Sequence, residues 1–70
     1  MKLSARNQIK GKITDIAEGA VNAIVLLDIG GGNTISATIS MNAVRELQLK
    51  VGAEAYAVIK STSVMVGIDG

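Results

Sequence analysis

The chain contains neither cysteine nor histidine among its 70 residues. Their absence removes thiolate and imidazole ligands, thiol nucleophiles, disulfide bonds and the usual general base near neutral pH. Zinc, haem and iron–sulfur sites are therefore not expected, and neither is any other cation site or an organic cofactor. The six acidic residues fall among expected strand ends and turns, where no two are expected to form an acid–base pair. The sequence thus favours a binding or structural protein over an enzyme.

Aromatic residues are almost missing, since Tyr56 is the only one. Proteins that bind single-stranded nucleic acid usually stack bases on aromatic side chains along a basic groove, and each stacked base contributes about 1–3 kcal/mol. A chain with one aromatic residue and a formal net charge of +1 lacks most of that affinity. Single-stranded nucleic-acid binding is therefore kept only as an alternative, and no nucleic-acid partner is expected.

Long apolar runs are also absent. No segment approaches the roughly 20 apolar residues that a membrane span requires, and Met1–Arg6 turn polar and basic with no apolar segment behind them. We expect no membrane association and a cytoplasmic location. The length allows one domain, residues 1–70. A short chain without disulfides or a structural metal usually gains stability by association, so self-assembly is the expectation.

Alternating apolar and polar residues predict strands, as in Ile9-Lys10-Gly11-Lys12-Ile13. Ile16 breaks this alternation, which predicts a bulge near Asp15. Gly30-Gly31-Gly32 suits a tight hairpin and lacks the residues of a phosphate-binding loop. The expected strands are 9–16, 21–29, 34–40, 54–60 and 63–68, with one short helix at 41–47. This order predicts an all-β fold, a five-stranded Greek-key barrel of the OB type with its helix between the third and fourth strands.

The second expected strand is apolar on both faces through Ala23-Ile24-Val25-Leu26-Leu27. A strand in one small barrel should show water one of its faces, so a second subunit is expected to cover the outer side chains. This pattern also permits an alternative class of function, a purely structural module that assembles into a ring.

Several residues that can donate hydrogen bonds occur in segments without acids. They are Ser4, Arg6, Asn7, Ser40, Asn42, Lys60, Ser61 and Thr62. A tetrahedral dianion offers only acceptors, so hydroxyls, backbone N–H groups and one or two cations suit it. Each residue also has an ordinary explanation, because Ser40 can cap the helix, Arg6 can pair with an acid and Lys60 can extend from a strand end to solvent.

Three segments of the sequence resemble the motifs of a known protein family. Ser4-Ala5-Arg6-Asn7-Gln8, Ile39-Ser40 and Val58-Ile59-Lys60-Ser61-Thr62 are similar to motifs of the molbindin, or Mop-domain, family. The likeness extends over essentially the whole chain, and the first segment is its most specific part. The resemblance implies a protein that binds and stores molybdate or tungstate in the cytoplasm for molybdenum homeostasis.

The resemblance also implies a homo-hexamer, described as a trimer of dimers, with oxyanions held between subunits. Carried over by position, one group at the dimer interface comes from one subunit and comprises Ser4, Ala5, Arg6, Lys60 and Ser61. The neighbouring subunit supplies Ser40 with the amides near Met41 and Ala43. A second kind of site, near a threefold axis, is matched to Gly19, Ala20 and Asn22.

Overall fold

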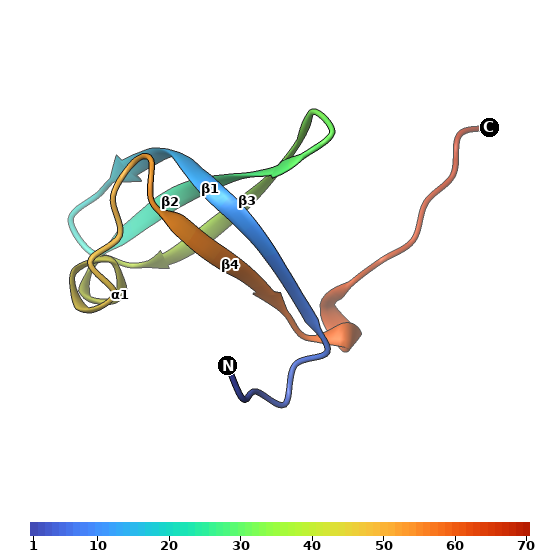
Figure 1. Ribbon diagram of the computed structural model, residues 1–70, viewed down its shortest axis with the longest axis horizontal. Helices are drawn as coiled ribbons and strands as arrows, with labels where there is room; N and C mark the ends of the chain where they lie inside the picture. Colours follow the sequence, from blue (N-terminus) through green and yellow to red (C-terminus); the bar gives the residue numbers. More distant parts are fainter.

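A curled antiparallel sheet makes up most of the structure, a computed structural model that describes residues 1–70 (Figure 1). The elements follow in the order β1 (Asn7–Glu18), β2 (Asn22–Gly30), β3 (Asn33–Ser40), α1 (Met41–Glu46), β4 (Glu54–Ile59) and a 3-10 turn, η1 (Ser61–Ser63). The strands are arranged β3-β2-β1-β4, so β3 and β4 are the edges of the sheet. The first four expected strands and the helix are confirmed.

The bulge and the tight hairpin of the sheet occur at the positions that the sequence predicted. The register between β1 and β2 shifts between Ile13 and Asp15, which confirms the expected bulge. The β2–β3 hairpin contains Gly30, Gly31 and Gly32 at φ values of 94°, 63° and 78°. Side chains other than glycine rarely adopt this region, so the three glycines let the strands reverse direction over a short distance.

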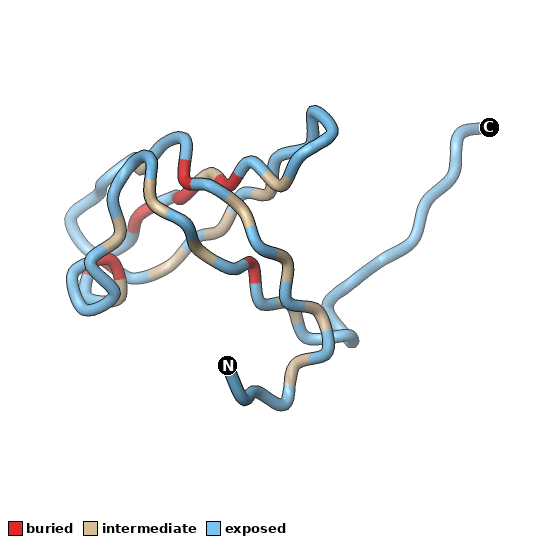
Figure 2. The backbone as a smooth tube through the Cα atoms, in the orientation of Figure 1, coloured by how far each residue is buried: buried red, intermediate tan, exposed pale blue.

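The core lies on the concave side of the sheet. Ile13 is 1% exposed and packs with Val25, Leu27 and Ala57, while a second cluster joins Ala23 to the helix. That second cluster is completed by Met41 and Val44 of α1. Only seven of the 70 residues are buried (Figure 2). Because apolar burial is the main source of folding free energy, a lone chain with so small a core is only marginally stabilised.

The outer face of β2 is apolar, as the sequence predicted. Ala23, Val25 and Leu27 point into the core, so the alternation of a strand turns Ile24 and Leu26 outward. Ile24 is 46% exposed and Leu26 is partly buried. Two large aliphatic side chains therefore lie on the convex side of the sheet, beside hydroxyl-bearing residues of β3.

The expected fifth strand, residues 63–68, is wrong for the single chain, and so is the closed barrel. Residues 64–70 are exposed and belong to no strand, and Figure 1 shows this segment running away from the sheet. An apolar run becomes a strand only where a sheet edge lies beside it to accept its hydrogen bonds. Here η1 follows β4 directly and leads the chain away from both free edges. The result is a four-stranded open sheet.

The helix is short because its stabilising contacts are few. α1 has six residues, begins after the capping residue Ser40 and buries only Met41 and Val44. Gln48, just past its end, has a φ of 53°, a left-handed conformation that ends the helix. No helix of the structure is long and apolar enough to pass through a bilayer.

Candidate anion-binding site

Pairing between β1 and β4 brings two of the predicted donor segments together. Asn7, the first residue of β1, is opposite Ile59, the last residue of β4. The Asn7 Nδ2 also donates a hydrogen bond to the Ile59 carbonyl oxygen at 3.2 Å. Arg6 precedes this pair and Lys60 follows it, so the two cationic residues lie just beyond the end of the ladder, one next to each strand. Residues 52 positions apart in sequence are thereby joined at one end of the sheet.

The two cations of this group have no acidic partner. Arg6 and Lys60 are both exposed, and the structure contains one ion pair, from Lys10 Nζ to Glu54 Oε2 at 3.8 Å. The ordinary explanation of Arg6, pairing with an acid, therefore does not apply in the single chain. Two neighbouring positive charges without a carboxylate create a local positive potential, which attracts a doubly charged anion.

The remaining residues of this group flank the cations. Ser4 and Ser61 are exposed, whereas Ala5 is partly buried. The Gln8 Nε2 donates to the Ala5 carbonyl oxygen at 3.1 Å, which holds the segment before β1 against the strand. On the other side, the Ser63 N–H donates to the Lys60 carbonyl oxygen at 2.8 Å, and Ser61 lies within that turn. The structure thus gathers Ser4, Ala5, Arg6, Lys60 and Ser61 at one end of the molecule.

The second predicted group lies where β3 meets α1. Ser40 Oγ accepts a hydrogen bond from the Ala43 N–H at 3.0 Å, so this serine caps the helix. The Met41 N–H donates to the Val21 carbonyl oxygen at 2.7 Å. The two amides named from the sequence, those of Met41 and Ala43, therefore already have partners within the chain. The Ser40 hydroxyl hydrogen and the Asn42 amide are the donors that this turn retains for an external acceptor.

One chain does not bring the two groups together. Ser40 pairs with Asn22 at the start of β2, beside the Glu18 end of β1, whereas Arg6 precedes the Asn7 end of that strand. β1 has 12 residues, and at about 3.3 Å per residue its ends are separated by roughly 36 Å along the strand. A hydrogen bond spans about 2.7–3.2 Å. No single oxyanion can contact both groups of one chain.

The turn expected at the threefold axis lies beside the second group. The Gly19 N–H donates to the Asn22 carbonyl oxygen at 2.9 Å, which closes the β1–β2 turn around Ala20. A Cβ at Gly19 would lie 2.7 Å from that oxygen, so the close approach requires glycine. Because Asn22 pairs with Ser40, the turn and the helix start are neighbours, a proximity that the sequence reasoning did not anticipate.

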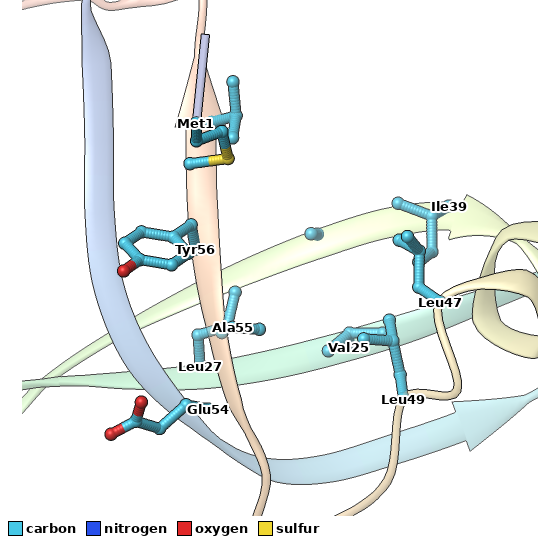
Figure 3. A pocket seen from close by; sticks show the side chains of 11 residues that line it. Met1, Val25, Leu27, Ile39, Leu47, Leu49, Glu54, Ala55 and Tyr56 are labelled. Atoms are coloured by element: carbon cyan, nitrogen blue, oxygen red, sulfur yellow. The ribbon is translucent and has the colours of Figure 1, made fainter. Parts of the chain in front are cut away.

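A cavity of about 360 Å³, which sequence reasoning missed, has different chemistry. Its walls come from β2, β3, β4, the segment after α1 and Met1, and ten of its eleven lining residues are hydrophobic (Figure 3). The only charged side chain among them is Glu54, so the cavity does not suit a dianion. No three acidic, cysteine or histidine side chains gather anywhere in the structure.

Comparison with known proteins assigns the chain to a protein family. Residues 3–66 match the family model of the TOBE domain. The chain belongs to the TOBE-domain family. A relative in Haemophilus influenzae, named a probable molybdenum-pterin-binding protein, is 65% identical to this TOBE-domain protein over 69 residues, covering 99% of this chain and all of the relative.

Solved structures place the TOBE-domain protein among the small Mop proteins. MopII from Clostridium pasteurianum superposes with a TM-score of 0.89 at 51% identity, covering 96% of this chain and 100% of MopII. A molybdate-binding protein from Sporomusa ovata superposes with a TM-score of 0.90 at 31% identity, covering 97% of this chain and 100% of that one. These relatives confirm the resemblance to the Mop family that the N-terminal and C-terminal motifs indicated.

Proposed function

We propose that this TOBE-domain protein binds molybdate, or the closely similar tungstate, and stores it in the cytoplasm for molybdenum homeostasis. Binding takes place between subunits of a homo-hexamer built as a trimer of dimers, and no catalysis or organic cofactor is involved. The relatives' names support the ligand, since they refer to molybdate or to molybdenum-pterin binding. The donor groups at the ends of the sheet support the site.

The observation that carries the proposal is the separation of two acid-free donor groups. Arg6 and Lys60 stand side by side without an acid at one end of the sheet, and Ser40 lies at the other end. Two copies that lie antiparallel in a twofold dimer bring the first group of each chain against the second group of the other. The anion then receives charge-assisted hydrogen bonds from the cations and neutral ones from hydroxyls and amides. The proposed ligands are Ser4, the amide of Ala5, Arg6, Lys60 and Ser61 from one chain, and Ser40 with the helix start at Met41–Ala43 from the next.

The chemistry of the donors explains the preference among anions. Phosphate is partly protonated near neutral pH, and its hydroxyl donor finds no carboxylate acceptor among the residues of either group. Sulfate is fully ionised and smaller than molybdate. A cage sized for the longer bonds of molybdate leaves sulfate oxygens short of their donors, so size excludes it.

A site shared by two chains links binding to assembly. A ligand that binds the assembled form and not the single chain shifts the equilibrium towards assembly, and assembly raises its apparent affinity by the same factor. The turn at Gly19, Ala20 and Asn22 forms a further proposed site, where backbone groups from three copies meet. Because Asn22 pairs with Ser40 within one chain, the two kinds of site are close together in the proposed assembly.

Native mass spectrometry with and without molybdate tests this function. Discrete mass additions of whole molybdate ions to a hexamer are expected, with no additions from an equal concentration of sulfate. A hexamer that takes up no molybdate would favour the purely structural role. A monomer that takes up none would refute both the site and the assembly. The double variant Arg6→Ala/Lys60→Ala serves as the negative control for additions at the dimer interface.

A further inference from the structure

The segment that precedes β1 is joined to the rest of the chain by a single hydrogen bond. In that bond the Gln8 Nε2 donates to the Ala5 carbonyl oxygen at 3.1 Å. No backbone hydrogen bond and no ion pair involves residues 1–6, which belong to no strand or helix. Three of the proposed anion ligands, Ser4, Ala5 and Arg6, are in this segment. Their position therefore depends on few contacts, and the Gln8 bond is the directional one among them.

The two amide side chains at the start of β1 hold different partners. Successive side chains of a strand alternate between its two faces. Asn7 is partly buried and reaches across to the Ile59 carbonyl oxygen of β4, whereas Gln8 is exposed and reaches back to Ala5. A carbonyl oxygen only accepts hydrogen bonds, so the nitrogen of each amide is the atom that faces it. Asn7 thus fixes β1 to β4, and Gln8 fixes the segment that carries Arg6 to β1.

The Gln8 bond acts on Arg6 through the peptide that joins Ala5 to Arg6. The Ala5 carbonyl and the Arg6 N–H belong to one planar unit, and no peptide bond of the chain is cis. Holding the carbonyl oxygen towards Gln8 therefore fixes the plane of this peptide and, with it, the direction in which the chain enters Arg6. The Arg6 side chain is exposed and makes no ion pair, so no acid of the chain redirects its guanidinium.

We propose that Gln8 is a positioning residue of the anion site, which orders residues 4–6 before the anion binds and does not touch the anion itself. This inference rests on the proposed function and deepens it, because it names the contact that prepares the part of the site before β1. A donor segment that is already ordered loses less conformational entropy on binding, so its affinity for the anion is higher. Together with the Asn7 bond, the Gln8 bond fixes Arg6 relative to Lys60.

The variant Gln8→Met tests the proposal, because methionine has a similar length and no donor. Gln48→Met is the matched control, since Gln48 is the chain's other glutamine, is exposed and lies outside both donor groups. We expect Gln8→Met to bind molybdate roughly two- to tenfold more weakly in a calorimetric titration, and Gln48→Met to bind it as the unmodified protein does. Thermal unfolding without molybdate should be the same in all three proteins, because the Gln8 bond is exposed and outside the core.

A double-mutant comparison shows whether Gln8 acts through Arg6 or binds the anion directly with the second hydrogen of its Nε2. In the Arg6→Ala background, a positioning residue has lost a side chain that it positions. Adding Gln8→Met to Arg6→Ala should therefore reduce the affinity for molybdate by a smaller factor than Gln8→Met alone. A direct ligand would lose the same factor in both backgrounds, and the proposal would then be wrong.

Nuclear magnetic resonance relaxation measures the order of the segment without any anion. The backbone order parameters of Ala5 and Arg6 should fall in Gln8→Met towards the value of about 0.6 that marks flexible backbone, and they should not change in Gln48→Met. Unchanged order parameters in Gln8→Met would overturn the proposal, whether or not molybdate binds. If the segment loosens in Gln8→Met but the unmodified protein binds no molybdate, the proposed function is refuted and the ordering of residues 4–6 by Gln8 is supported.

Discussion

The side-chain amide of Asn7 donates a hydrogen bond to the backbone carbonyl of Ile59 across 52 positions of sequence, at 3.2 Å. The bond adds to the ladder pairing of the same two residues and fastens the first residue of β1 to the last residue of β4. Asn7 touches no anion in the proposed site. It sets the relative position of Arg6, which precedes Asn7, and Lys60, which follows Ile59.

Replacing Asn7 with alanine is expected to weaken molybdate binding without removing any proposed ligand. A hydrogen bond of this kind contributes about 0.5–1.5 kcal/mol, which corresponds to a loss of affinity of roughly two- to tenfold if it is fully transmitted to the site. Calorimetric titration measures the affinity, and Thr34→Ala, exposed on β3, is the matched control. An affinity equal to that of the control would show that this end of the sheet holds its shape without the bond.

The single variants Arg6→Ala and Lys60→Ala should bind molybdate much more weakly and keep the fold. Both side chains are exposed and make no ion pair, so the fold loses little, whereas the anion loses a charge-assisted donor. Such a donor contributes about 1.5–3 kcal/mol, or roughly 10- to 150-fold in affinity. Circular dichroism checks the fold and calorimetry the binding.

Lys50→Ala is the control for these two variants, because Lys50 is an exposed cation outside both donor groups. It should bind molybdate as the unmodified protein does. If all three variants lost affinity equally, general positive charge and not a defined site would account for the binding.

The variant Ile24→Asp is expected to disrupt assembly while leaving the chain folded. Ile24 lies on the convex face of β2 and is 46% exposed, so a single chain tolerates a carboxylate there. A neighbouring subunit that covers this face would have to bury that charge, which is costly without a partner. Light scattering is expected to show species smaller than a hexamer. A hexamer of unchanged mass would place the subunit contacts elsewhere.

Gly11→Ala should destabilise the sheet, because a Cβ at this position would lie 2.8 Å from the Asp28 carbonyl oxygen. That oxygen belongs to the backbone and cannot move without disturbing the β1–β2 pairing. Overpacking of this kind costs about 1–3 kcal/mol. Chemical denaturation measures the change, and Gly67→Ala is the control, since nothing lies within 4 Å of its added Cβ.

The sequence predicted most of the sheet because its signals are local. Alternation located the first four strands, the break at Ile16 located the bulge, and the run of glycines located the hairpin. The fifth strand at 63–68 was wrong for one chain because an apolar pattern does not supply the sheet edge with which a strand must pair. The cavity was missed because its walls come from separate strands, whose arrangement no local pattern specifies.

The sequence indicated which donor segments to examine, but not the hydrogen bonds that they make within the chain. Arg6 and Lys60 were named together from motifs, and the β1–β4 register brings the ends of their two strands together. That the Met41 and Ala43 amides already have partners follows from how the chain turns between β3 and α1, which no residue pattern specifies. The proximity of the Gly19 turn to Ser40 likewise depends on pairing between distant strands.

Ser40 has two roles in this account, and one pair of variants separates them. Its Oγ accepts from the Ala43 N–H, and its hydroxyl hydrogen is proposed to bind the anion of a neighbouring chain. Ser40→Ala removes the cap, which costs about 0.5–2 kcal/mol, and also removes the donor. Ser40→Asp keeps a capping acceptor of a preferred kind and places a negative charge where the dianion would lie.

We therefore expect Ser40→Asp to retain nearly the thermal stability of the unmodified protein in the absence of molybdate and to lose binding more completely than Ser40→Ala. Thermal unfolding and calorimetry are run on the same samples. Val51→Asp, exposed in the turn between α1 and β4, controls for an added carboxylate that is at neither the cap nor the convex face. If Ser40→Asp bound molybdate as tightly as Val51→Asp, the helix start would be only a cap, and the anion would be held by the end of the sheet that carries Arg6.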